Sequence, residues 1–148
     1  MFEGKVEAIN ITPAAEGPMQ SVVEVRAIPG RGLEGDRYFD RTNSEPRREL
    51  TLVEAEAIEA FRAEFKIDFE LDGTRRNVLT RGVPLNHLVG REFWIGDVKA
   101  RGLQLCEPCA TLQRLSHPKV LPGLLHRGGL RAQIITEGII RVGETIRE

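Results

Sequence analysis

The sequence predicts a mostly β fold of the α+β class, barrel-like, with residues 1–148 forming a single domain that carries one or two short helices. Three observations support this prediction. Apolar and polar residues alternate in several short segments, glycine is frequent at 15 positions, and only one segment has clear helical spacing. Short strands separated by turn residues are typical of barrels and sandwiches. Strands and helices do not alternate regularly, which argues against a doubly wound nucleotide-binding fold.

The composition is that of a globular chain with little net charge. The 148 residues carry a formal net charge of -1 with a sequence pI near 6.3, so the bulk positive charge typical of nucleic-acid-binding proteins is absent. No apolar stretch is long enough to span a bilayer, and residues 1–10 lack the layout of a signal peptide. We therefore expect a cytoplasmic protein that binds neither nucleic acid nor membrane, with its two cysteines reduced.

The first third of the chain predicts two strands and two loops. Residues 4–11 and 21–28 alternate in polarity with a period of two, and proline and glycine punctuate the segment between them, which suits a hairpin with a long loop. Residues 30–38 begin with three glycines in six positions, so this loop is expected to need unusual backbone angles or a close backbone approach. Residues 40–48 contain no apolar side chain and predict an exposed, mobile loop.

The middle of the chain predicts one helix over about residues 52–65. Thr51 and Glu54 match a capping box, in which each side chain bonds the backbone N–H of the other. Apolar side chains then recur at helical spacing. They are Ala55, Ile58, Phe61 and Phe65.

The last half of the chain again predicts short strands. A helical turn is expected over 110–115, between the strands and a closing pair that resembles a hairpin. The predicted strands cover residues 75–80, 91–100 (as a strand pair or a bulged strand), 103–105, and the hairpin of 130–136 with 139–146.

The segment Cys106-Glu107-Pro108-Cys109 is the first candidate for chemistry. It follows a predicted strand and precedes the helical turn, so Cys109 would lie at a helix N-terminus that favours the thiolate. A thiolate attacks a persulfide sulfur or ligates a soft metal. Pro108 fixes the local backbone. Isolated thiols often simply pack in a core, but a pair around Glu-Pro in a turn favours the functional interpretation.

The same cysteine pair leaves two alternatives open. A dithiol redox pair normally opens a helix in a βαβ setting, which this chain does not show. A zinc site needs about four ligands, and the later histidines His117 and His126 are too widely spaced for a zinc finger. A purely structural, partner-binding role is also open.

Cationic and amide side chains beside glycines and strand ends form a second candidate. Arg37 follows the glycine loop, Arg75 and Asn77 lie near a strand start, and Arg127 and Arg131 flank a pair of glycines. Arginine binds phosphates through two parallel hydrogen bonds, and glycine loops present backbone N–H groups to anions. A single arginine is usually a solvated surface residue, so an anion site requires that several of these side chains converge.

These segments, taken in order, resemble the MOSC domain, named for the C-terminal domain of molybdenum cofactor sulfurase, in its compact stand-alone bacterial type. The resemblance extends over about residues 4–146 and depends on the ordered set rather than on one motif. The matching segments are Gly17-Pro18-Met19, Gly32-Leu33-Glu34-Gly35-Asp36-Arg37, Leu50-Thr51-Leu52-Val53-Glu54, Arg75-Arg76-Asn77-Val78, residues 85–90, Ile95-Gly96-Asp97, Cys106-Glu107-Pro108-Cys109 and Gly128-Gly129-Leu130-Arg131-Ala132.

The resemblance implies a β-rich, barrel-like fold and a functional cysteine. In the family this cysteine carries sulfane sulfur for metal–sulfur cluster assembly, or ligates molybdenum in a bound molybdenum cofactor (molybdopterin), and Cys109 matches it. By the same resemblance Arg37, Arg75 and Asn77 match positions near the anion- and pterin-binding pocket, and Pro108 lies beside the thiol. Cys106 departs from many relatives and is a candidate resolving thiol, or incidental.

The resemblance also implies partners and an alternative activity. A sulfur carrier requires a sulfur donor such as a cysteine desulfurase, and a metal–sulfur or molybdoenzyme acceptor. Larger relatives imply a molybdenum-dependent reductase of N-hydroxylated compounds, an analogy at the level of the family alone. The oligomeric state is left open.

Overall fold

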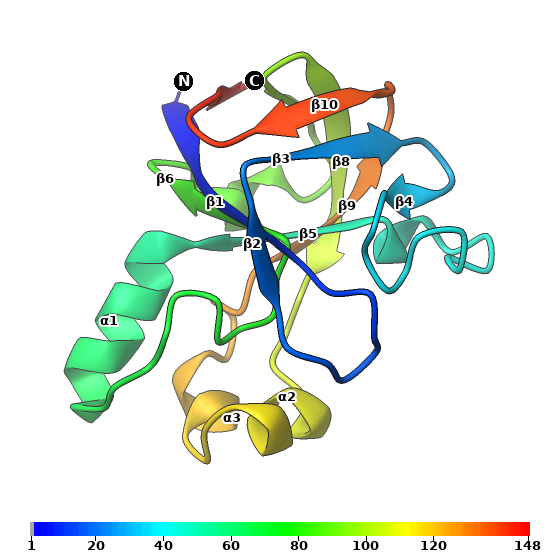
Figure 1. Ribbon diagram of the computed structural model, residues 1–148. Helices are drawn as coiled ribbons and strands as arrows, with labels where there is room; N and C mark the ends of the chain where they lie inside the picture. The colour runs from blue at the N-terminus through cyan, green and yellow to red at the C-terminus, as the bar shows by residue number, and fades with distance from the viewer. Residues whose placement is uncertain (1) are drawn as a thin grey trace.

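A computed structural model describes residues 2–148 as a closed β-barrel with three α-helices outside it (Figure 1). Seven strands form the barrel in the order β1-β11-β7-β8-β9-β5-β6, and β6 pairs with β1 to close it. Only β5 and β6 are parallel among these pairs. The strands are β1 (Glu3–Ile11), β5 (Leu50–Glu54), β6 (Val78–Arg81), β7 (Glu92–Ile95), β8 (Val98–Leu105), β9 (Leu130–Ile134) and β11 (Thr145–Arg147). The mostly β, barrel-like fold predicted from the sequence is confirmed.

The remaining elements cover the barrel or extend it. Strand β2 (Gln20–Val22) pairs with β1, and a separate sheet has the order β10-β3-β4. In Figure 1, α2 and α3 lie below the barrel, at the end opposite the two termini, and α1 lies at its side. Their bounds are β3 (Glu24–Ile28), β4 (Gly32–Leu33), β10 (Gly138–Arg141), α1 (Ala55–Phe65), α2 (Ala110–Leu115), α3 (Val120–Gly123) and the 3₁₀ helices η1 (Pro46–Arg48) and η2 (Leu85–Leu88).

Two apolar clusters hold the fold together. The larger one fills the barrel, because inward positions alternate with outward ones along each strand. The smaller one lies between α1 and the outer surface of β5 and β6. Leu52 and Val78 therefore belong to the barrel cluster, while Val53 and Leu79 belong to the outer one. Both surfaces of β5 and β6 are covered, which explains why apolar residues stand next to each other at Leu52-Val53 and Val78-Leu79.

The predicted start of the helix was wrong by about three residues. Residues 50–54 form strand β5, and α1 begins at Ala55. Glu54 is the N-cap residue but makes no side-chain capping bond; its carboxylate accepts a hydrogen bond from Leu85 N at 3.2 Å instead. Thr51 pairs with Arg131 across the ladder to β9. Strand pairing on both sides of β5 thus outweighs the local capping signal.

The first predicted hairpin forms only in part, and the second was wrong in its pairing. Strand β1 pairs with β2, but the chain bends at Val23, which is 76% exposed, and β3 continues into the other sheet. At the other end, β9 pairs with β5 and β8, whereas β10 pairs with β3. The predicted strand at 103–105 is the end of the longer strand β8. Hydrophobic patterning located these strands but could not choose their partners.

The glycine loop has the unusual backbone angles that the sequence predicts. Gly30, Gly32 and Gly35 have φ values of 76°, 102° and 87°, a region that side chains disfavour. The loop over 40–48 is mostly exposed and contains η1. From residue 2 onward, no helix is both long and apolar enough to cross a membrane.

Candidate functional site

A pocket of about 120 Å³ brings Cys109 together with four arginines. The segments that meet there lie far apart in the sequence: the β1–β2 loop, the loop after β4, the residues before β6, the start of β9, and α2 with its N-cap residue. Its lining consists of Ala15, Arg37, Tyr38, Arg75, Arg76, Cys109, Thr111, Leu112, Leu115 and Arg131. The pocket therefore combines a nucleophile with concentrated positive charge.

The thiol of Cys109 lies at the start of α2 and is exposed. Cys109 is the N-cap residue of this helix, and its Sγ accepts a hydrogen bond from Leu112 N at 3.4 Å. A backbone donor thus faces the sulfur, which acts as nucleophile and metal ligand in its thiolate form. Cys106, at the end of β8, is only 1% exposed. The predicted strand end and helical turn around the cysteine segment are confirmed.

Two glycines allow the cysteine segment to lie against the chain that leads into β9. Cys106 N donates a hydrogen bond to Gly129 O at 2.7 Å. A Cβ atom on Gly128 would lie 2.7 Å from Cys106 O and 3.1 Å from the ring of Pro108. Gly129 has a φ of 123°, and a Cβ there would overlap Leu52 O. The Gly128-Gly129 pair thus permits a close backbone approach directly behind the thiol.

Arg76 fixes this segment from the inside. Its Nε donates to Gly128 O at 2.9 Å, and its Nη2 donates to Cys106 O at 2.9 Å and to Glu107 O at 3.3 Å. Burial lowers the pKa of Arg76, because its charge has lost contact with water. Sequence reasoning missed this residue, although it lies inside the Arg75-Arg76-Asn77 motif.

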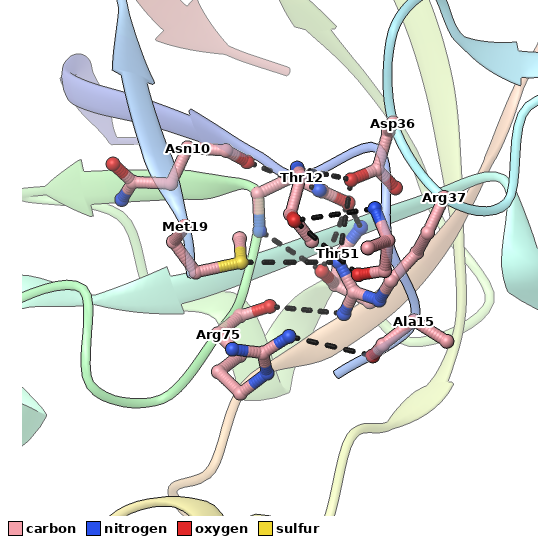
Figure 2. A network of polar contacts seen from close by, with 10 residues as sticks. Asn10, Thr12, Ala15, Met19, Asp36, Arg37, Thr51 and Arg75 are labelled. Carbon is pink, nitrogen blue, oxygen red and sulfur yellow. Dashed lines mark hydrogen bonds and ion pairs between the residues drawn. The ribbon is translucent and has the colours of Figure 1, made fainter. Parts of the chain in front are cut away.

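Arg37 and Arg75 lie at the other wall of the pocket, where the Arg37 side chain bonds the backbone of Arg75. Figure 2 shows Arg37 pointing toward Met19 and Arg75, with Nη2 donating to Arg75 O at 3.4 Å and Nη1 forming an ion pair of 3.2 Å with Asp36. Arg75 donates to Ala15 O at 3.4 Å. Burial and the charge of Arg37 lower the pKa of Arg75. Its φ of 61° is uncommon for a residue other than glycine.

The charges of the pocket are not balanced within the protein. Arg131 projects from β9 on the side opposite its buried neighbours and donates to Arg47 O at 3.4 Å. Among residues 2–148, no carboxylate forms an ion pair with Arg75, Arg76 or Arg131. The fourth arginine of the pocket, Arg37, pairs with Asp36. Guanidinium groups gathered in this way bind anions such as phosphates.

A scan against protein-family models matches residues 40–147 to the MOSC domain. The chain belongs to the MOSC domain family. This confirms the family resemblance inferred from the sequence, and it supports a function related to the molybdenum cofactor in general terms. A search of curated proteins found no match.

Solved structures share the MOSC fold at low sequence identity. The YuaD protein from Bacillus subtilis is similar with a TM-score of 0.82 and 16% identity, over 99% of this chain and 97% of that one. YiiM from Geobacillus stearothermophilus has a TM-score of 0.72 and 16% identity, over 97% and 74% of the two chains. YiiM from Escherichia coli has a TM-score of 0.72 and 20% identity, over 99% and 69%. These similarities concern the fold.

Asn77 has a structural position beside the MOSC pocket rather than a place in its lining. Its side chain is buried, Oδ1 accepts from Thr51 N and Thr51 Oγ1 at 3.1 Å, and Nδ2 donates to Asn10 O at 3.2 Å. These bonds tie β1 and β5 to the start of β6. Pro108 is likewise buried behind the thiol, outside the pocket lining. Arg127 pairs with Glu64 at 2.7 Å and does not line the pocket.

The cysteine pair of this MOSC domain has no further metal ligands around it. Across residues 2–148, no cluster of three or more His, Cys, Asp or Glu side chains could hold a metal ion. His126 instead contacts Glu107, with Nδ1 2.6 Å from Oε2. His117 lines a different pocket. The observed arrangement therefore gives the zinc alternative no support.

A larger pocket of about 330 Å³ adjoins the thiol pocket. The two share Arg75 and Leu115 in their linings. The larger pocket also contains apolar side chains, among them Met19 and Phe69, and the acidic side chains of 68, 70 and 72. A ligand whose anionic group lies beside Cys109 thus has space to extend past Arg75.

Proposed function

We propose that this MOSC domain carries sulfur on Cys109, inside an anion-binding pocket that can also receive a molybdenum cofactor. One observation carries the proposal: an exposed thiol shares a pocket with four arginines, three of which have no carboxylate partner among residues 2–148. A thiolate takes up sulfane sulfur, and the resulting persulfide keeps a negative charge. Arginine side chains beside it stabilise that charge.

The residues present also fit the molybdenum cofactor. Cys109 offers a soft thiolate ligand, which suits molybdenum bonded to sulfur. Arg37, Arg75, Arg76 and Arg131 would bind the phosphate, and the adjoining pocket would accept the pterin. When bound, the cofactor supplies the redox chemistry of its metal. Asn77 and Pro108 act indirectly in this proposal, by fixing the backbone around the pocket.

The partners of such a carrier follow from its chemistry. A persulfide on an exposed cysteine must be filled by a sulfur donor, such as a cysteine desulfurase, and emptied by a metal–sulfur or molybdoenzyme acceptor. The exposure of Cys109 makes transfer between proteins sterically feasible. The burial of Cys106 disfavours a rapid internal attack on the persulfide, and so favours a carrier over a dithiol redox pair.

Intact mass and elemental analysis of the protein, purified without reductant, test the proposal. We expect a gain of about 32 Da, one sulfur atom, that dithiothreitol removes and that Cys109→Ala lacks. Arg127→Ala, which breaks an ion pair away from the pocket, should keep the gain and serves as the control.

Other results would redirect or overturn the proposal. Stoichiometric molybdenum with a pterin signal would identify a cofactor-bound form, and activity of that form on N-hydroxylated compounds would identify a reductase. A mass loss of two hydrogens, with Cys106 and Cys109 joined, would support a dithiol pair instead. A protein that takes up neither sulfur nor cofactor when both are offered would contradict it.

A further inference from the structure

We infer that the thiol pocket binds a small dianion that carries sulfane sulfur, with thiosulfate as the representative substrate, and that Cys109 takes its sulfur directly from it. The inference rests on the proposed function, because it requires that Cys109 carry a persulfide. It adds a substrate class and a sulfurtransferase activity. No protein donor would then be needed to fill the carrier.

The pocket has room for a single tetrahedral anion beside the thiol. Its volume is about 120 Å³, and it adjoins the larger pocket at Arg75 and Leu115. That space accepts an ion the size of thiosulfate. Cys109 belongs to the lining, so an ion held by the arginines lies next to the nucleophile.

The charge of the pocket favours a dianion over a monoanion. Arg37, Arg75, Arg76 and Arg131 contribute four positive charges, and the carboxylate of Asp36 offsets one. A thiolate on Cys109 offsets another, which leaves two positive charges. A doubly charged ligand brings the site to neutrality.

The arginines approach from different directions. On one wall, Arg37 donates to the backbone carbonyl of Arg75, and Arg75 donates to that of Ala15. Arg76 is anchored behind the cysteine segment, and Arg131 projects from β9. Anchored guanidinium groups bind the oxygens of a sulfonate-like group without reorganising. The sulfane sulfur, which carries no oxygen, is then left to face the thiol.

The transfer is balanced without an added oxidant or reductant. The Cys109 thiolate attacks the sulfane sulfur of thiosulfate, and a new S–S bond forms. The S–S bond of thiosulfate breaks, and its electron pair leaves with sulfite. Cys109 becomes a persulfide anion. Negative charge grows on the leaving sulfite, where arginines without carboxylate partners stabilise it.

Two sulfur donors offered in parallel test the inference. The reduced, desalted protein is incubated with thiosulfate or with glutathione persulfide, which has no sulfonate group. We expect a gain of about 32 Da with either donor. With thiosulfate, sulfite should appear in an amount equal to the persulfide formed. Cys109→Ser should abolish both.

Charge variants show whether the pocket recognises thiosulfate. Arg131→Gln should slow loading from thiosulfate roughly tenfold or more, and by a much larger factor than it slows loading from glutathione persulfide. Arg127→Gln, outside the pocket, should load from both donors like the parent. Circular dichroism of each variant checks that it is folded.

The outcomes separate this inference from the proposed function. Loading from glutathione persulfide but not from thiosulfate would overturn the inference and leave sulfur carriage standing. No loading from either donor would overturn both. Equal loading from thiosulfate in the parent and in folded Arg131→Gln would also overturn the inference, since the arginines would then play no part in recognition.

Discussion

Thr51 and Asn77 are joined by three hydrogen bonds: the Thr51 hydroxyl accepts from Asn77 N at 3.0 Å and donates to Asn77 Oδ1 at 3.1 Å, and Thr51 N donates to the same oxygen at 3.1 Å. These bonds link β5 to the residues just before β6, next to the thiol pocket. The sequence predicted a helix cap at Thr51 and, by the family resemblance, a cofactor-binding residue at Asn77. In the structure these two residues bond to each other.

The Thr51 hydroxyl should therefore contribute to stability. Thr51→Val keeps the shape of the side chain but leaves Asn77 N without its acceptor and Asn77 Oδ1 with one donor fewer, so we expect a loss of about 1–3 kcal/mol in the free energy of unfolding. Thr51→Ser keeps the hydroxyl and should lose less. Urea denaturation measures both. Equal stability of Thr51→Val and the parent would show that the pair contributes nothing.

Arg75 should separate stability from anion binding. Its φ of 61° strains any residue with a Cβ, so Arg75→Gly should unfold with a free energy about 1 kcal/mol higher than Arg75→Ala. Both variants lose the guanidinium. Phosphate should therefore raise the melting temperature of the parent more than that of either variant. If phosphate stabilised all three proteins equally, Arg75 would have no part in binding it.

The two cysteines should react in a fixed order. Cys109 is exposed and Cys106 is 1% exposed, so brief treatment of the folded protein with iodoacetamide should modify Cys109 alone. Cys106 should react only after denaturation. Peptide mass mapping identifies the modified residue. Modification of Cys106 in the folded protein at a similar rate would show that its cover opens readily, and would revive its candidacy as a resolving thiol.

Glu49 should make the protein less stable as the pH rises above the acidic range. Burial raises the pKa of Glu49 above its ordinary value of 4.5, although hydrogen bonds from the backbone of Ile134 and Gly30 oppose this. The folded state then holds the proton more tightly than the unfolded state. The resulting stability is present below the ordinary pKa and is lost as the pH rises through the folded-state pKa.

The matched variant for this effect is Glu49→Gln. A glutamine oxygen can still accept from Gly30 N and Ile134 N, but it does not titrate. Thermal unfolding is measured at a series of pH values. The melting temperature of Glu49→Gln should rise relative to that of the parent as the pH rises from about 4.5 toward neutrality. A constant difference across that range would contradict the raised pKa.

Local signals predicted those features of the fold that depend on local physics. Alternating polarity located most strands, and apolar spacing located the buried residues of α1 from Ala55 onward. The positive φ angles at Gly30, Gly32 and Gly35 follow from the dense glycines. The placement of the cysteine segment between a strand and a helical turn followed from the pattern on either side of it.

Features that depend on distant neighbours escaped the sequence. The capping signal at Thr51 was overridden because β6 and β9 pair on both sides of β5. Arg76 and Arg131 are 55 positions apart in number, and they meet at the thiol pocket only because those same two strands flank β5. No local sequence feature of either arginine shows that the two lie close together. The size and composition of the anion pocket could therefore not be derived from the sequence.

The closing strand of the barrel affects how the chain folds during translation. Strand β11 fills the gap between β1 and β7, yet its residues 145–147 are translated long after both of them. Until they leave the ribosome, β1 and β7 each present an unpaired edge that can recruit strands from other nascent chains. We expect the barrel to close only once residues 145–147 have left the ribosome, so a chain that stops before residue 145 should be prone to aggregate.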